Sequence, residues 1–295
     1  IAFAGPMAIG RNSLPISDRD IVCDLPYPLH CGLWFDHHPG NLEDVKLRGY
    51  DPAQLPGRFD FKDSCSRVVH EYFSPKVELP PYFEVTVHHA DTIDAFRYRD
   101  IQDWREETPG KVIDCALKMV GPSKDGDLLR KKSVFLLRDN PLDVVAVNPE
   151  IQHHYRAYQG QEERMMLIIS EASCFLSHDG GHELIIVDLT RYKRRPTVFR
   201  NLAFLLYPSA QAVIEIRSLY HQGVKTNNFN ISISLSPNVD PVTLQKDLGE
   251  MMRELNIGDG HRGAASGTVN CRSKDEMIRT KNELLEKILR FWKRA

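Results

Sequence analysis

Residues 32–41 read Gly-Leu-Trp-Phe-Asp-His-His-Pro-Gly-Asn, and this stretch decides the fold. An apolar run leads to Asp36, two imidazoles follow at once, and a Pro-Gly-Asn turn carries the chain away, which predicts the end of a buried strand. In open α/β sheets ligands bind at the carboxyl ends of the strands, so reactive groups are expected here. One carboxylate and two imidazoles suit Mn²⁺, Fe²⁺, Co²⁺ or Zn²⁺ better than Ca²⁺.

Two other stretches have the same pattern. Residues 21–24 are a short apolar run that ends in Asp24, and residues 83–92 alternate apolar and polar side chains up to Asp91. We therefore expect three strand ends that each deliver a carboxylate. The seven residues 25–31 are too few for a crossover helix, so the sequence leaves open whether the strands ending at Asp24 and Asp36 run parallel.

A glycine-rich stretch follows far downstream, where residues 258–267 read Gly-Asp-Gly-His-Arg-Gly-Ala-Ala-Ser-Gly. The Asp-His-His run, the carboxylates at predicted strand ends and this late loop occur in the order seen in the DHH/DHHA1 phosphoesterases. The sequence resembles that family from about Ile21 to Gly267. The family is named for the Asp-His-His run, and its second domain carries a Gly-Gly-Gly-His loop followed by Ala-Ala-Gly.

The resemblance implies a two-domain α/β fold. A DHH-like catalytic domain with a mainly parallel sheet flanked by helices is expected at residues 1–150, and a smaller, mixed α/β DHHA1-like domain at residues 178–295. A broad apolar band beginning at Pro149 predicts a connecting helix over residues 151–177. Local patterns predict further strands at residues 1–8, 183–189, 212–216 and 229–235, an amphipathic segment at 242–256 and helices at 63–73 and 274–294.

The resemblance also implies a metal centre. Asp24 would bridge two ions, His37 and Asp91 would complete the shell of one of them, His38 would face the phosphate as a catalytic group, and Asp36 would orient the imidazoles. Mn²⁺ is the expected ion, with Mg²⁺ or Co²⁺ as alternatives.

The expected substrate-binding residues lie in the glycine-rich stretch, whose backbone amides and side chains would contact phosphate. They are Gly258, Gly260, His261, Arg262 and Gly263. The alternative is a helix-start turn whose small residues serve close packing.

The function implied by the resemblance is hydrolysis of a phosphodiester or phosphomonoester in an interdomain cleft. Short oligoribonucleotides, cyclic dinucleotides and 3′-phosphonucleotides are the expected substrates. Two alternatives remain open, namely an exopolyphosphatase and a degenerate member that binds nucleotides without cutting them.

The chain departs from the family pattern in three places. The first family motif, Asp-x-Asp, is absent upstream of Asp24, and because Ile1 begins in a strand-like run we expect that an upstream piece is missing. Asp259 replaces the middle glycine of the loop. The strand ending at residues 232–236 lacks the arginine that many members carry there.

Composition excludes some classes of protein. The net charge is −2, so affinity for nucleic acid would have to come from local basic clusters. Two candidates are residues 130–132 and residues 191–195, the second with Tyr192 as a surface on which a base could stack. Such basic runs are more often solvated faces of the protein. Six scattered cysteines without a Cys-x-x-Cys pair predict free thiols in the cytoplasm. No apolar run has the length of a membrane span. The sequence does not decide whether the protein forms a homodimer.

Overall fold

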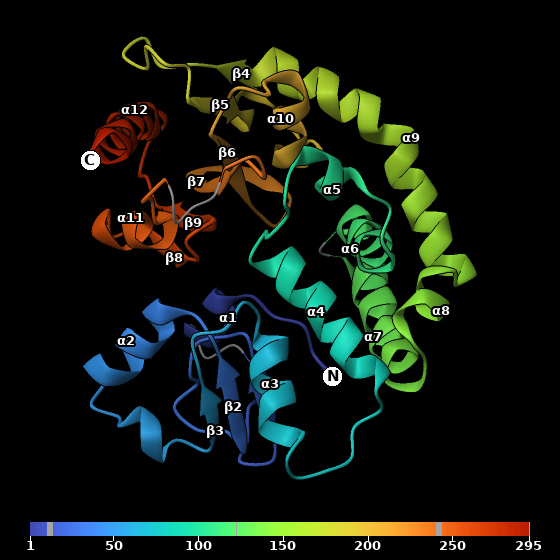
Figure 1. The fold of residues 1–295 in the computed structure, drawn as a ribbon. Coiled ribbons are helices and arrows are strands. Elements are labelled where there is room, and N and C mark those ends of the chain that lie inside the picture. The colour runs from blue at the N-terminus through green and yellow to red at the C-terminus, as the bar shows by residue number, and fades with distance from the viewer. Residues whose placement is uncertain (11–13, 122, 240–243, 295) are drawn as a thin grey trace. The chain divides into compact units, whose positions relative to one another are not determined.

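The computed structural model describes residues 1–10, 14–121, 123–239 and 244–294 (Figure 1). The chain forms two compact units, one of residues 1–97 and 107–160 and the other of residues 98–106 and 161–295. The first unit has a parallel sheet and the second a mixed sheet, each with helices, so the predicted two-domain α/β class is confirmed.

The sheet of the first unit has three parallel strands in the order β1 (Ile21–Cys23), β2 (Leu33–Asp36) and β3 (Gly57–Phe59). Cys23 is paired with Phe35, and Asp36 with Phe59. This answers the question that the short connection left open, because β1 and β2 run parallel. The residues that follow β1 and β2 therefore lie at the same end of the sheet, where the strands have their carboxyl ends.

Helices cover both faces of this sheet because successive side chains of β2 point in opposite directions. Trp34 packs with Val22 and Val45 beside α2 (Pro39–Leu47), and Phe35 packs with Cys65 and Val68 of α3 (Cys65–Phe73). Both aromatic side chains are fully buried. At roughly 25 cal/mol per Å², burial of an aromatic side chain of this size contributes about 4–6 kcal/mol. The Ser64 side chain caps the N-terminus of α3 by accepting a hydrogen bond from the Arg67 amide, and the helix starts where the sequence predicted it.

Helices form the rest of the first unit. They are α1 (Pro6–Gly10), η1 (Pro52–Gln54), α4 (Tyr82–Asp94), α6 (Pro109–Val120), α7 (Lys124–Asp139), α8 (Leu142–Ala146) and the first half of α9 (Pro149–Ala172). Two strand predictions were wrong, because residues 1–5 are irregular before α1 and residues 83–92 lie within α4. Across the described ranges, no helix is both long enough and apolar enough to span a bilayer. All six cysteines are free thiols.

The second unit is built on a six-stranded mixed sheet of order β4-β5-β6-β7-β9-β8. Only the β5–β6 pair is parallel. The strands are β4 (Ser173–Cys174), β5 (Leu184–Asp188), β6 (Ala212–His221), β7 (Val224–Leu235), β8 (Gly258–Gly260) and β9 (Ala264–Val269). The predicted strands at 183–189, 212–216 and 229–235 are present, and the second and third are longer than predicted.

The helical elements of the second unit are α5 (Ile101–Arg105), η2 (Leu189–Arg191), η3 (Arg200–Leu202), α10 (Ala203–Leu206), α11 (Leu248–Glu254) and α12 (Lys274–Lys293). Alternate residues of β7, among them Phe229 and Ile231, pack against Met251 of α11 and Leu285 and Trp292 of α12. The predicted C-terminal helix is thus confirmed as α12. Residues 242–243 of the predicted amphipathic segment lie outside the described residues.

The glycine-rich stretch folds as the β8–β9 hairpin, so neither a helix-start turn nor an open loop is present. Its glycines allow close backbone contacts. A Cβ on Gly258 would lie 2.0 Å from the Ser266 carbonyl oxygen, and Gly260 has φ 159° with Ala265 beside it. The first backbone amides of α11 donate hydrogen bonds to carbonyl groups of the hairpin turn. The Leu248 amide, for example, donates to the Arg262 carbonyl at 3.1 Å. Close packing therefore accounts for these glycines.

We predict that Gly258→Ala lowers the free energy of unfolding by about 2 kcal/mol, because the hairpin must open to admit the methyl group. Gly160→Ala is the matched control, since no atom lies within 4 Å of its added Cβ and helix propensity should raise stability by about 0.5–1 kcal/mol. Urea unfolding followed by circular dichroism measures both. Equal stabilities for the two variants would contradict this account of the hairpin.

Candidate metal centre

The carboxylate of Asp36 organises the end of β2. It is fully buried, and its Oδ1 accepts from the His37 amide at 2.7 Å, the His38 amide at 3.1 Å and His38 Nδ1 at 2.8 Å. Its Oδ2 accepts from Asn41 Nδ2 at 2.5 Å. A buried carboxylate is costly unless its lone pairs are satisfied, and these bonds satisfy them. They also fix the turn from β2 into α2.

The His38 ring is held with Nδ1–H toward Asp36, which leaves Nε2 on the other side of the ring. Burial lowers the pKa of His38, but the hydrogen bond and charge of Asp36, with the charges of Asp24 and Asp94, outweigh burial and raise the pKa to about 9. The His38 side chain therefore carries a positive charge at neutral pH in the metal-free protein.

The His37 ring points to a different group of atoms. Its Nδ1–H donates to the Lys62 carbonyl at 3.0 Å, and its Nε2 lies 3.2 Å from Asp24 Oδ1 and 3.4 Å from Asp94 Oδ2. Three elements meet at this point, since Asp24 follows β1, His37 follows β2 and Asp94 ends α4.

Asp24 holds its place at a conformational cost. Its φ is 62°, in the left-handed region, while its amide donates to the Phe35 carbonyl at 3.0 Å. Asp is among the few residues that tolerate this conformation, and backbone strain of this kind is concentrated at functional sites. The turn directs the carboxylate toward His37 at the end of the sheet.

These residues fit a divalent cation. Asp24, Asp36, His37 and His38 each offer one donor atom, and these atoms all lie within 4.8 Å of one another. With Nδ1–H committed to Lys62, a neutral His37 would face two carboxylates with the Nε2 lone pair, so a proton or a cation is needed between them. A backbone carbonyl that fixes the other ring nitrogen is the usual support of a metal-binding histidine.

The protonation of Asp94 reflects the same crowding. Burial and the negative charge of Asp24 raise its pKa, the imidazoles of His37 and His38 oppose them, and the net result is a pKa of about 6. Burial lowers the pKa of His37, but the hydrogen bonds to Asp24 and the Lys62 carbonyl and the charge of Asp94 together outweigh it, so the net shift is upward. The metal-free centre thus binds protons more tightly than isolated side chains do, and a bound cation would displace them.

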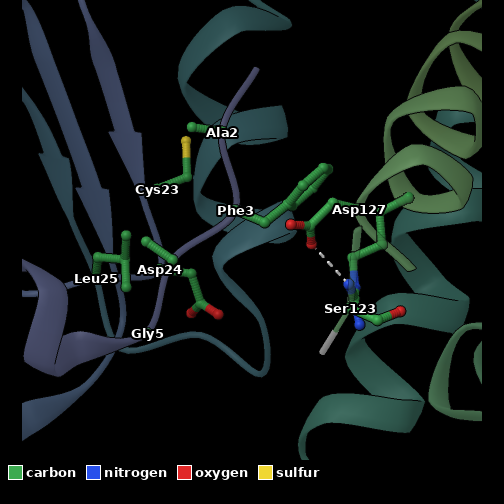
Figure 2. A pocket seen from close by; sticks show the side chains of 10 residues that line it. Ala2, Phe3, Gly5, Cys23, Asp24, Leu25, Ser123 and Asp127 are labelled. Carbon is green, nitrogen blue, oxygen red and sulfur yellow. Dashed lines mark hydrogen bonds and ion pairs between the residues drawn. The ribbon is translucent and has the colours of Figure 1, made fainter. Parts of the chain in front are cut away.

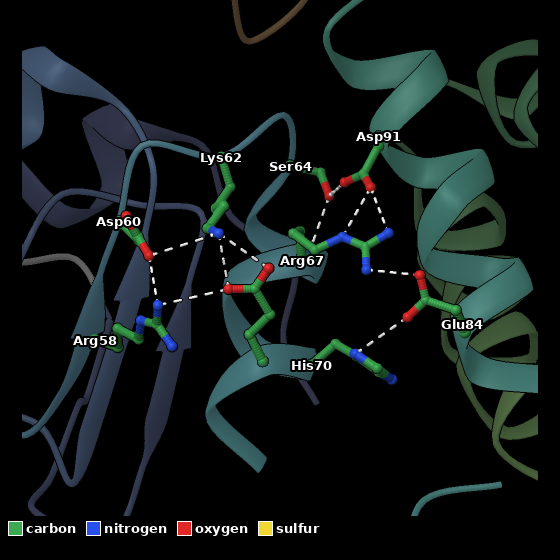
Figure 3. Close-up of polar contacts among 9 residues, drawn as sticks. Arg58, Asp60, Lys62, Ser64, Arg67, His70, Glu84 and Asp91 are labelled. Atoms are coloured by element: carbon green, nitrogen blue, oxygen red, sulfur yellow. Dashed lines mark hydrogen bonds and ion pairs between the residues drawn. The ribbon is translucent and has the colours of Figure 1, made fainter. Parts of the chain in front are cut away.

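Asp91 does not join this cluster. Its Oδ2 accepts from Arg67 Nε at 2.9 Å and Nη2 at 2.8 Å, and its Oδ1 accepts from Ser64 Oγ at 2.6 Å (Figure 3). Asp94, the last residue of α4, has Oδ2 at 3.4 Å from His37 Nε2, whereas Asp91 is held by Arg67 and Ser64. The structure therefore brings Asp94, and not the expected ligand Asp91, to the His37 ring.

Sequence reasoning missed Asp94 because the β-branched residues of the stretch indicated a strand. The helix start carried a signal for the correct assignment. Pro81 is the N-cap residue and Glu84 lies in the first turn, a placement that favours an α-helix N-terminus.

The loop of residues 60–64 presents the Lys62 carbonyl to His37, and two ionic groups hold it (Figure 3). Glu71 of α3 binds Lys62 Nζ at 2.8 Å and Arg58 Nη2 at 3.5 Å. At the other end, Ser64 is tied to Asp91. The orientation of His37 therefore depends on α3 and α4 through this loop.

A pocket of about 710 Å³ lies beside Asp24. Figure 2 shows Asp24 on one wall and Ser123 and Asp127, from the start of α7, on the opposite wall. Arg130 also lines the pocket, and its guanidinium is held by Asp127 at 2.9 Å and by the Gly121 carbonyl at 2.7 Å. The volume is in the range of pockets that bind small organic ligands.

In the second unit, the predicted substrate-binding residues His261 and Arg262 lie in the turn of the β8–β9 hairpin. The His261 amide donates to the Ala264 carbonyl at 2.7 Å, and Arg262 Nε lies 3.7 Å from Asp247. Asp259, which replaces the family glycine, is bound by Arg253 at 2.6 Å. Its negative charge is therefore balanced within the unit.

Comparison with solved structures identifies the fold. The pGpG-specific phosphodiesterase PggH from Vibrio cholerae aligns with a TM-score of 0.62 and 18% sequence identity, over 98% of this chain and 90% of that chain. The chain has the fold of this phosphodiesterase. The fold that the resemblance to DHH/DHHA1 phosphoesterases predicted is therefore confirmed.

Two other solved structures align more weakly. One is an exopolyphosphatase-related protein from Bacteroides fragilis, with a TM-score of 0.37 and 11% identity over 89% of this chain and 65% of that chain. The other is the DHH domain of a protein that belongs to a family of ribosomal proteins, with a TM-score of 0.43 and 13% identity over 92% of this chain and 68% of that chain. At these scores neither carries an argument. No protein-family model and no curated protein sequence matches the chain.

We predict that Asp36→Asn lowers the pKa of His38 from about 9 toward the ordinary 6.5, because the variant removes the side chain that raises the pKa most and leaves the opposing effect of burial. Proton NMR titration of the histidines in EDTA measures the change. In the wild type the raised pKa stabilises the fold below pH 6.5, and this stabilisation is lost as the pH rises through 9. A His38 pKa that stays near 9 in the variant would overturn the assignment.

We further predict that Glu71→Ala weakens Mn²⁺ binding on the order of 10-fold, because the loop that orients His37 loses its anchor. Isothermal titration calorimetry gives the dissociation constant. Glu78→Ala is the control, since Glu78 is exposed and forms no ion pair with a described residue. The same affinity in both variants would show that the loop needs no anchor from α3.

Proposed function

We propose that this chain is a metal-dependent phosphoesterase that hydrolyses phosphodiester or phosphomonoester bonds of small nucleotides. The observation that carries the proposal is the convergence of His37 Nε2 with carboxylate oxygens of Asp24 and Asp94 at the end of a parallel sheet. The fold shared with a phosphodiesterase named for pGpG supports small nucleotides as the substrate class.

Asp24, His37 and Asp94 would hold a divalent cation, with Mn²⁺ the best match to this mixed donor set and Mg²⁺ or Co²⁺ as alternatives. When bound, such a cation supplies a water that ionises near neutral pH and a positive charge for phosphate oxygens. The two-ion centre implied by the sequence would need further carboxylates.

The side chains around the cation have separate roles in the proposal. His38, positively charged at neutral pH and oriented by Asp36, would donate to a phosphate oxygen and offset the charge that develops there. Lys62, through its carbonyl, would keep His37 Nε2 directed at the cation.

The pocket beside Asp24 would receive a nucleoside. Its volume of about 710 Å³ suits such a group, and Arg130 would contact a phosphate or a base edge. We assign catalysis to the first unit. The second unit would add further phosphate contacts, with His261 and Arg262 as donors at the hairpin turn and with Gly258, Gly260 and Gly263 supporting that turn.

We predict that Asp94→Asn lowers kcat on the order of 100-fold or more, because a ligand of the cation is lost. Asp91→Asn should instead lower the free energy of unfolding by roughly 2 kcal/mol, since Arg67 loses one of its two carboxylate partners and keeps Glu84. The amide oxygen of Asn can still accept from Ser64 Oγ, so the loop that orients His37 stays anchored and kcat of the folded protein should be nearly unchanged. Turnover is measured with Mn²⁺ on pGpG, a cyclic dinucleotide, 3′-phosphoadenylate and tripolyphosphate.

The pair of variants makes the assay decisive. Loss of turnover in Asp91→Asn with normal turnover in Asp94→Asn would return the ligand to Asp91. Preferred cleavage of tripolyphosphate would identify an exopolyphosphatase. Tight metal-independent nucleotide binding without any product would identify a binding protein.

A further inference from the structure

Cationic side chains are concentrated in one part of the second unit. Between residues 189 and 239 the sequence has seven Lys or Arg residues and a single carboxylate, Glu215, although the whole chain has a net charge of −2. Glu215 is buried and forms an ion pair with Arg217. The exposed charge of this stretch is therefore almost entirely positive, as in surfaces that bind phosphate backbones.

Residues 191–195, Arg-Tyr-Lys-Arg-Arg, form the centre of this region and are called here the basic loop. Lys193, Arg194 and Arg195 are exposed, and none of them forms an ion pair with a residue that the structure describes. Arg191 lies 3.5 Å from Glu171, so its charge is partly balanced. Three adjacent cations thus remain available to an external anion.

The basic loop is anchored from behind. Asp188 caps η2 by accepting from the Thr190 amide, and Lys281 binds Asp188. The Lys225 ammonium, at the start of β7, donates to the carbonyls of Thr190 and, at 3.0 Å, Tyr192. Backbone carbonyls are held against the unit while the side chains of residues 193–195 face solvent. A loop that is fixed in advance loses less conformational entropy on binding.

An aromatic side chain lies within the same loop. The Arg191 guanidinium lies 5.1 Å from the centroid of the partly exposed Tyr192 ring. An aromatic ring beside several cations is the combination that binds single-stranded nucleic acid, because bases stack on the ring while cations contact phosphates. Inorganic polyphosphate has no base to stack.

We propose that the basic loop binds the backbone of single-stranded nucleic acid, with Tyr192 stacking on a base. As a substrate of the proposed phosphoesterase, this points to single-stranded oligonucleotides; that consequence rests on the proposed function, whereas binding by the loop does not.

The test measures binding of a fluorescein-labelled 12-nucleotide oligo(A) RNA by anisotropy, on the full chain and in EDTA so that no cleavage occurs. The variant Lys193→Gln/Arg194→Gln/Arg195→Gln should bind at least about 10-fold more weakly in 50 mM salt. Its slope of log affinity against log salt should be shallower by about 2, because each phosphate contact contributes about 0.7. Tyr192→Leu should weaken binding while leaving that slope unchanged.

The control Lys274→Gln/Lys287→Gln/Arg290→Gln removes the same charge from exposed positions of α12 in the same unit. An equal loss of affinity in both triple variants, or no loss in the first, would overturn the proposal. Competition by polyphosphate as effective as that by RNA, at equal phosphate concentration, would also overturn it in favour of a general polyanion surface. Because no turnover is measured, failure of the phosphoesterase assay would not affect this result.

Discussion

The centre depends on the burial of one carboxylate. Asp36 has no access to solvent, so its oxygens must be satisfied from within, and the partners are two successive amides, the His38 ring and Asn41. Satisfying them forces the chain to turn at the end of β2 and start α2. The turn places the two adjacent imidazoles in different surroundings. One histidine is held by Asp36, and the other is directed at Asp24 and Asp94.

That separation gives the two imidazoles different chemistry. His38 keeps its positive charge because a carboxylate lies on its Nδ1 side, whereas His37 has a carbonyl on that side and two carboxylates on the other. A neutral imidazole nitrogen beside two carboxylates suits a cation, and a charged imidazole suits an anion. The proposed phosphoester hydrolysis would need both, and two adjacent histidines would then serve one reaction.

Sequence reasoning succeeded where the signals were local. The strand ending at Asp36, the capped helix at Ser64 and the amphipathic α12 each follow from periodicity and capping residues within a short window. It failed for α4, whose β-branched residues favour a strand but whose Val87 is buried in the packing of helices. Packing overrode local propensity there, and the carboxylate beside His37 is Asp94, about one helical turn after the expected Asp91.

The glycine-rich stretch shows a different limit of the sequence. Glycine permits both a nest of amides around an anion and close backbone contact, and the pattern alone does not distinguish them. In the hairpin the positions of Gly258 and Gly260 are filled by neighbouring backbone, and the first amides of α11 are already bound to carbonyls of the turn. These amides and glycine positions are therefore already used within the fold and do not form a nest around an anion.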